Sequence, residues 1–282
     1  MGTNINNPKN EVDNVLGLNR TLFLVIVILL CVLSLCVGIY AQFFYKYSES
    51  DPFMLGLVGN AKAEEELKVL ESEFDTIFTN EFKSNTDNNP SKIDETKGLI
   101  YTSSIVNETV EEIYSINANI PVININSDVA KQMNDDIVKT FADEIPKIKG
   151  NTDKYKSYIV EYTAFAKDDL LSLAVKSTYY EQEGVQTTNI KTYNYNLAQN
   201  QSIDLATVMK ARGLTPENVQ RDINKKIEDL IAADAEVGYG TVTRDINSDM
   251  YKIEKTETYL VSDQGDIYII YNYGTKKDVL VF

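Results

Sequence analysis

Residues 157–197 read SYIVEYTAFAKDDLLSLAVKSTYYEQEGVQTTNIKTYNYNL, and this stretch decides the fold. It contains three runs rich in β-branched and aromatic residues, at 157–165, 170–180 and 187–197. The polar segments AKDD and EQEGVQ separate the runs. Such runs joined by short polar connections predict successive antiparallel strands. We therefore expect a meander of three strands at the centre of the folded domain.

Further strands are expected on both sides of this meander. The preceding strand-like runs are GLIYTSSIV (98–106) and YSINANIPVININ (114–126). The following ones are TETYLVS (256–262), DIYIIYNY (266–273) and DVLVF (278–282). All five are rich in Ile, Val and Tyr, the residue types that favour strands.

Helices are expected between these strands. The first begins after Ser127, a suitable N-cap, and carries an apolar residue at every fourth position until Pro146 ends or kinks it. A short helix stops at Gly213, and Thr215 followed by Pro216 is a typical start for a long one. The predicted class is therefore α+β, with an antiparallel sheet or sheets and helices packed on one face.

A long apolar segment precedes the domain. Residues 21–44, TLFLVIVILLCVLSLCVGIYAQFF, contain no charged side chain. As a helix they would extend about 36 Å, enough to cross a hydrocarbon core of about 30 Å. A cleaved signal peptide is the alternative, but its apolar region is usually shorter and ends at a small-x-small site, where this chain has Ile39. We expect an uncleaved transmembrane signal anchor.

The anchor implies five consecutive parts: a short cytoplasmic tail (1–20), the transmembrane helix (21–44), a juxtamembrane stalk with an amphipathic helix (45–82), a polar linker (83–98) and an extracytoplasmic α+β domain region (99–282). The short polar tail would stay inside, so the N-terminus is expected in the cytoplasm and most of the chain outside the cell membrane. The stalk helix would pack on the domain or join two copies as a weak homodimer.

The composition excludes several classes of function. The net charge is −15, which argues against nucleic-acid partners and against docking on an anionic lipid surface. The chain has no histidine, and its two cysteines, Cys31 and Cys36, lie inside the apolar segment. Catalytic triads with histidine and zinc sites with histidine or outer cysteine are therefore excluded. We expect no metal and no cofactor, and the lack of outer cysteine favours a Gram-positive source.

Paired carboxylates are the remaining candidates for catalysis. The pairs are Asp135–Asp136, Asp168–Asp169 and Glu181 with Glu183. With 42 acidic residues in the chain, such neighbours arise by composition alone. The segment DQGD (263–266) lacks the twelve-residue calcium loop with its terminal Glu and predicts a tight turn. We expect a binding protein rather than an enzyme, and a carboxylate-based hydrolase of wall glycans is kept as an alternative.

Tyrosine is the residue type that points most directly to binding. The chain has eighteen tyrosines and no tryptophan. A tyrosine ring offers flat apolar area and a hydroxyl tip, which suits contact with a protein or a glycan, although it also suits a half-buried sheet. The candidate ligand-binding residues lie on two successive strands and the hairpin between them: Tyr179, Tyr180, Glu183, Gln186, Tyr193 and Tyr195.

Three segments are similar to a known family: ANIPVININSDVAKQMNDDI (118–137), YYEQEGVQTTNIKTYNYNLAQNQSIDLATVM (179–209) and YLVSDQGDIYIIYNYG (259–274). They resemble the paired extracytoplasmic domains of unknown function found in lysozyme-sensing anti-sigma factors and ahead of peptidoglycan deacetylase modules. The resemblance covers about residues 99–282 and is one of pattern. It implies this fold, a position at the cell surface and a binding role.

The sequence thus predicts a single-pass membrane protein that displays a binding or sensing domain in the bacterial cell envelope. Its ligand would be an envelope protein or a peptidoglycan component. An anti-sigma-like regulator is the alternative, acting through residues 5–18 of the tail. There, EVDNVLGL (11–18) carries apolar residues at helical spacing.

Overall fold

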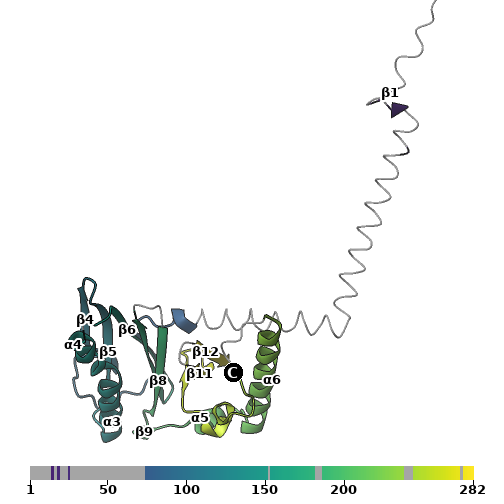
Figure 1. Ribbon diagram of the computed structural model, residues 1–282. Helices are drawn as coiled ribbons and strands as arrows, with labels where there is room; N and C mark the ends of the chain where they lie inside the picture. The colour runs from purple at the N-terminus through teal and green to yellow at the C-terminus, as the bar shows by residue number, and fades with distance from the viewer. Residues whose placement is uncertain are drawn as a thin grey trace, which may run out of the picture. The chain divides into compact units, whose positions relative to one another are not determined.

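The computed structural model describes residues 14–15, 18–19, 25, 74–151, 153–181, 186–237, 244–273 and 276–282. The chain divides into two units, Met1–Gly59 and Asn60–Phe282, and the second contains most of the helices and strands labelled in Figure 1. In the first unit, β1 (Asn14–Val15) pairs antiparallel with β2 (Leu18–Asn19). Residues 14–15 and 18–19 of the tail therefore pair as strands, where the apolar spacing predicted a helical turn.

The expected membrane anchor, 21–44, lies outside the described residues except for Val25, and so do residues 45–73 of the expected stalk. Among the residues that the structure does describe, no helix has the length and the apolar composition needed to cross a membrane.

The second unit is built on a seven-stranded sheet in the order β4-β5-β6-β7-β8-β9, with β3 paired to β6. The strands are β3 (Glu81–Asn85), β4 (Ile100–Val110), β5 (Tyr114–Ile123), β6 (Lys156–Lys167), β7 (Leu170–Glu181), β8 (Gln186–Asn196) and β9 (Gln201–Ser202). The predicted meander is confirmed, because β6, β7 and β8 pair antiparallel along their lengths. Asp168, with φ 52°, makes the tight turn between β6 and β7.

Two strand pairs of this sheet are parallel, although the sequence predicted antiparallel pairing. Strands β5 and β6 are joined by α3 (Asp128–Ile137), the π-helix η1 (Val138–Ala142) and α4 (Glu144–Gly150). This helical crossover returns the chain in the same direction, so β5 pairs in parallel with the first half of β6. Strand β3 pairs in parallel with the second half of β6.

Residues 74–85 belong to the folded domain, although the sequence placed them in a stalk and a linker. Phe74 and Phe78 are only 1% and 6% exposed. Asn80 has φ 58°, and its backbone N–H and side-chain oxygen bond the backbone of Tyr162 at 2.9 and 3.0 Å. Strand β3 follows directly. Its residues are mostly polar because the pairing uses backbone groups, and this polarity is why the segment resembles a linker.

The helix boundaries predicted from capping residues are confirmed. The Ser127 hydroxyl accepts the Ala130 N–H at 3.1 Å at the start of α3. Gly213, with φ 71°, follows α5 (Leu205–Ala211), and Pro216 begins α6 (Pro216–Val237). The irregularity expected at Pro146 lies earlier, in η1, because Pro146 occupies the first turn of α4, where a missing N–H costs nothing.

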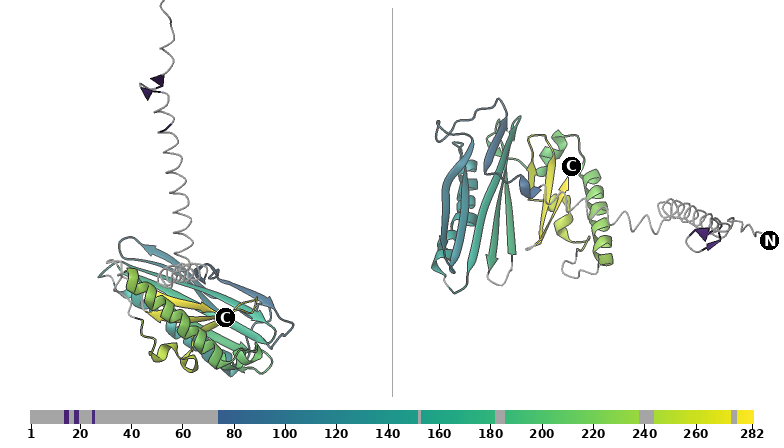
Figure 2. Two further views of the ribbon diagram at one scale, coloured as in Figure 1. Left: turned by 90° about the vertical axis from the view of Figure 1, so that its right-hand side faces the viewer. Right: turned by 90° about the horizontal axis from the view of Figure 1, so that it is seen from above.

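The last three strands, β10 (Tyr259–Val261), β11 (Ile267–Tyr273) and β12 (Lys276–Val281), form a second, antiparallel sheet. This smaller sheet lies against the face of the large sheet opposite α3 and α4, and α6 lies outside it (Figure 2). Alternate residues of β11 consequently enter different cores. Ile269 packs in the cluster with α5 and α6, whereas Ile270 packs against the large sheet. Each sheet thus has helices on one face and the other sheet on its second face.

Side chains of the large sheet satisfy the free edge of β10. The Ser172 hydroxyl accepts the Val261 N–H at 3.0 Å and donates to the Asn194 side-chain oxygen. The Asn194 amide donates to the Tyr259 carbonyl at 3.0 Å, and the Thr192 hydroxyl accepts the Tyr259 N–H at 3.1 Å. Because a buried backbone group without a partner is costly, these contacts fix how the two sheets dock.

Candidate functional site

Two of the four candidate tyrosines are framework residues. Tyr193 and Tyr195 are 8% and 0% exposed. The Tyr193 hydroxyl donates to Asp136 at 2.8 Å, and the Tyr195 hydroxyl donates to Ser127 at 2.9 Å. Burial and the bond to Asp136 raise the pKa of the Tyr193 hydroxyl, so it stays a proton donor. Both side chains hold α3 against β8 and offer almost no surface to a ligand.

The other candidates do not converge on one site. Tyr179 and Tyr180 are half-buried neighbours on β7, so their side chains point to opposite faces of the sheet. Tyr179 lies on the face that α4 covers. Gln186 is exposed and directly opposite Tyr180, and it therefore shares the face of Tyr180. Glu183 lies outside the described residues.

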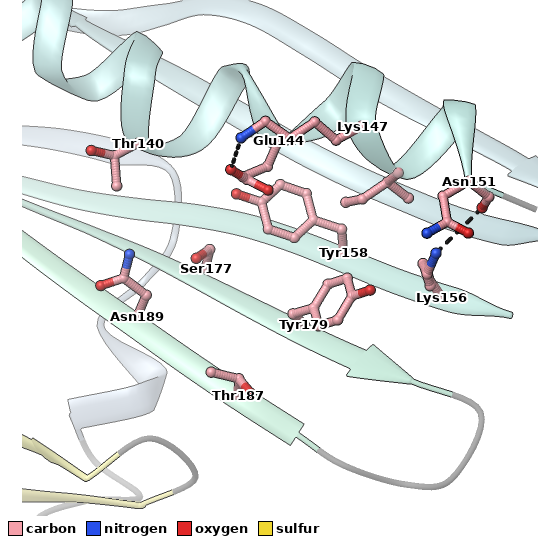
Figure 3. A pocket seen from close by; sticks show the side chains of 11 residues that line it. Thr140, Glu144, Lys147, Asn151, Lys156, Tyr158, Ser177, Tyr179, Thr187 and Asn189 are labelled. Carbon is pink, nitrogen blue, oxygen red and sulfur yellow. Dashed lines mark hydrogen bonds and ion pairs between the residues drawn. The ribbon is translucent and has the colours of Figure 1, made fainter. Parts of the chain in front are cut away.

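A cavity of about 400 Å³ lies beneath α4, at the end of the large sheet where β7 turns into β8 (Figure 3). Its floor comes from three strands. Lys156 and Tyr158 lie on β6, Ser177 and Tyr179 on β7, and Thr187 and Asn189 on β8. In each strand the two residues are separated by one position, which places all six on the same face.

Two tyrosines dominate the floor of the cavity. Tyr158 and Tyr179 are direct partners in the β6–β7 register. The Tyr158 hydroxyl donates to the Phe141 carbonyl at 3.1 Å, and burial raises its pKa to about 12, while a hydrogen bond with Ser177 opposes that shift. The Tyr179 hydroxyl donates to Glu181 at 3.3 Å, and burial is the main reason that its pKa is raised. Both hydroxyls are thus neutral donors at physiological pH.

Charged residues stand at the roof and at the open end of the cavity. Glu144 and Lys147, one turn apart on α4, form an exposed ion pair at 2.5 Å (Figure 3). Lys156 is 6% exposed, and its ammonium group donates to the Asn151 carbonyl at 3.4 Å. Lys156 forms no ion pair with any of the described residues.

Lys156, Tyr158 and Ser177 were not among the residues predicted from the sequence. Their signal was present, because Lys156 and Ser177 interrupt a face of β6 and β7 that is otherwise formed by apolar and tyrosine side chains. The residues that cover β6 and β7 come from α4, however, and the sequence pattern does not say which half of each strand α4 covers. The Tyr195 half is sealed by α3, and the Tyr179 half is hollow.

Two of the paired acids, Asp136 and Asp169, bond side chains of the framework. Asp136 bonds Lys191 at 2.8 Å as well as Tyr193. Burial acts against ionisation, but these two hydrogen bonds outweigh it and hold the pKa of the Asp136 carboxyl below its usual range. Asp168 makes the β6–β7 turn, and the neighbouring Asp169 accepts the side-chain amide of Asn88.

The predicted turn at 263–266 is confirmed. The Ser262 hydroxyl accepts the backbone N–H groups of Gln264, Gly265 and Asp266 at 3.1–3.2 Å. Within the part of the chain that the structure describes, no group of three or more acidic or cysteine side chains is placed to hold a metal ion.

Comparison with known proteins finds matches among solved structures. No family model matches the sequence, and no curated protein matches it. A DUF3298 family member from Bacteroides fragilis is 14% identical, with 64% of this chain and 89% of that chain covered and a TM-score of 0.34. A DUF3298 family protein from Pseudomonas aeruginosa is 11% identical, with 61% and 82% covered and a TM-score of 0.36.

Solved structures similar to this chain are thus DUF3298 family proteins. The predicted link to anti-sigma factors and deacetylases stays a prediction.

Proposed function

We propose that this chain is a single-pass membrane protein that holds its α+β domain outside the bacterial cytoplasmic membrane and binds a component of the cell envelope there. The observation that carries the binding role is the cavity beneath α4, which combines two tyrosine rings with hydroxyl, amide and ammonium groups. The observation behind the location is the uncharged segment 21–44.

The lining of the cavity supports binding rather than catalysis. Burial raises the pKa of Tyr158 and Tyr179, so both stay protonated, and Glu144 forms an ion pair with Lys147. General acid–base chemistry needs a group that exchanges its proton near the working pH, and the two tyrosines do not. Rings beside hydroxyl and amide groups are instead typical of sites that recognise saccharides and peptides.

Labelling of engineered cysteines tests the location. Asn10→Cys and Gly150→Cys are made separately in a chain whose two native cysteines are replaced by serine. Gly150 is exposed, and a Cβ there meets nothing within 4 Å. A membrane-impermeant maleimide should label the Gly150→Cys protein in intact cells, and the Asn10→Cys protein only after permeabilisation. Labelling of the Asn10→Cys protein alone would overturn the proposed location.

Retention on isolated peptidoglycan and on immobilised envelope proteins tests the binding role. The full chain in detergent micelles is compared with its Tyr179→Ala and Tyr180→Ala variants. These neighbours are both half-buried on β7 and face opposite sides of the sheet, so they form a matched pair. We expect Tyr179→Ala to lose retention and Tyr180→Ala to keep it. A wild-type protein that is not retained, or two variants that behave alike, would count against the cavity.

A regulatory role through the tail is a second candidate, in line with the anti-sigma factors that the sequence resembles. The observation that favours it is the β1–β2 pair, which gives the tail a defined element. A synthetic peptide of residues 1–20 should then capture a cytoplasmic regulator such as a sigma factor, and a peptide that captures none would remove this candidate.

A further inference from the structure

We infer that the cavity beneath α4 takes a carboxylate-bearing ligand, with the ammonium group of Lys156 holding the carboxylate. The inference rests on the proposed function, because it concerns the same cavity, and it names the chemical class of the ligand.

Lys156 is buried, with 6% of its surface exposed. Lysine is almost never fully buried unless it is paired, because removing its charge from water is costly. An ammonium group can donate three hydrogen bonds. The Lys156 ammonium makes one to a described residue, at 3.4 Å to the Asn151 carbonyl, which is longer than an ordinary N–H···O bond. The cost of burying this charge is therefore only weakly offset within the described residues.

A second lysine of the same sheet provides a comparison. Lys176 lies on the opposite face of β7 and is 8% exposed. Its ammonium group forms ion pairs with Asp75 at 3.2 Å and Glu161 at 3.3 Å, and lies 4.5 Å from the centroid of the Phe78 ring. The fold thus compensates this buried lysine with two carboxylates and an aromatic ring. Lys156, equally buried, faces a cavity instead.

The two described acids nearest to the cavity, Glu144 and Glu181, have other partners. Glu144 is paired with Lys147 on α4. Glu181 is opposite Lys156 in the β6–β7 register, yet it accepts the Tyr179 hydroxyl and forms no ion pair with Lys156. Among the described residues, no carboxylate thus pairs with the Lys156 ammonium, which leaves it to a carboxylate that enters from solvent.

The other lining residues indicate the chemistry of the remainder of the ligand. Tyr179 offers a ring, Ser177 and Thr187 offer hydroxyls, and Asn189 offers an amide. The volume of about 400 Å³ falls in the range of small-molecule sites, roughly 300–1,000 Å³. A small polar body that carries a carboxylate fits this lining, and its source is either an acidic sugar or the free end of a short peptide.

The test uses matched pairs of probes with the full chain in detergent micelles. Galacturonic acid is compared with galactose, and N-acetyl-dialanine with its C-terminal amide, by isothermal titration calorimetry. We expect one acid to bind about tenfold or more tightly than its neutral partner, the scale of one charge-assisted contact. Whichever acid binds identifies the source.

Variants assign the effect to Lys156. Lys156→Gln should weaken binding of the acid about tenfold, whereas Lys131→Gln, at an exposed lysine on α3 that does not line the cavity, should stay within about twofold. Glu181→Gln removes a nearby negative charge and should tighten binding of the acid, a result that a purely structural role of Lys156 would not produce. If Lys156→Gln does not fold, the wild-type protein still tests the inference, because its affinities for the acid and for the neutral probe can be compared.

The inference is overturned if acid and neutral probes bind equally, if Lys156→Gln binds as well as wild type, or if no acid binds at ~10 mM, an affinity too weak for a built site. Retention on peptidoglycan or on an envelope protein without a preference for acids would overturn this inference and leave the proposed function standing. The cysteine-labelling result bears on the proposed location alone.

Discussion

The buried bridge between Ser172 and Asn194 should contribute measurably to stability. Both side chains lie between the two sheets and serve the free edge of β10. Ser172→Ala leaves the buried Val261 N–H without its acceptor, and Asn194→Ala leaves the Tyr259 carbonyl without its donor. Each change also removes the bond between the two side chains themselves.

The magnitudes follow from the groups left unpaired. A buried donor without a partner costs about 1–3 kcal/mol, so Ser172→Ala should lower the free energy of unfolding by that amount. Asn194→Ala should cost about 2–4 kcal/mol, because it also leaves a small cavity. The double variant should cost about 1 kcal/mol less than the sum of the two, since the bond that joins the pair is lost only once.

Urea unfolding of the full chain in detergent micelles, followed by circular dichroism and tyrosine fluorescence, measures these values. Asn117→Ala, an exposed asparagine on β5, is the control and should stay within about 0.5 kcal/mol of wild type. The dependence on urea should keep its slope, because the unfolded surface is unchanged. The two side chains would not act as a bridge if the single variants were as stable as the control. The same would follow if the loss of unfolding free energy in the double variant equalled the sum of the two single losses.

Three further changes test other contacts. Asp136→Asn should destabilise the protein at neutral pH and less so as the pH falls below about 4, measured by urea unfolding at each pH. The pKa of Asp136 is lower in the folded than in the unfolded protein, so its ionised form stabilises the fold above the unfolded pKa. This stabilisation is lost as the pH falls through the folded pKa, and a difference in unfolding free energy between variant and wild type that is constant with pH would contradict it. Gly265→Ala should lower the thermal midpoint, because φ is +100° and the new Cβ would lie 2.0 Å from an Arg212 nitrogen. Adding Arg212→Ala should rescue only the steric part, so complete rescue would exclude backbone strain. Lys176→Met should speed proteolysis beside Phe78, and an unchanged cleavage rate would show that its ion pairs do not hold that segment.

The sequence predicted what depends on neighbouring residues. The meander, the Ser127 cap and the Pro216 helix start were all correct, because alternation and capping are local signals. The parallel pairing of β5 with β6 and the addition of β3 depend on contacts between distant segments, and composition does not report them. The expected anchor, 21–44, has not been tested by the structure.

The sequence did contain one signal that the smaller sheet is covered on both faces. Residues 267–271, IYIIY, are apolar on both faces of the strand, and a strand with one solvated face would alternate with polar residues. This pattern predicts burial on both sides of β11, as the structure has it. For the candidate site, the tyrosines were placed on the correct strands, but the choice between Tyr179 and Tyr195 needed the positions of α3 and α4.

The burial of Phe74 and Phe78 bears on how the domain can be produced alone. Both rings fill the seam between the sheets together with Leu260, Ile270 and Val279. A shortened chain that starts at Leu99, the boundary suggested by composition, would lose β3 and open that seam to water. Such a fragment would expose an apolar surface that is prone to aggregate, so the folding unit has to begin upstream of Phe74.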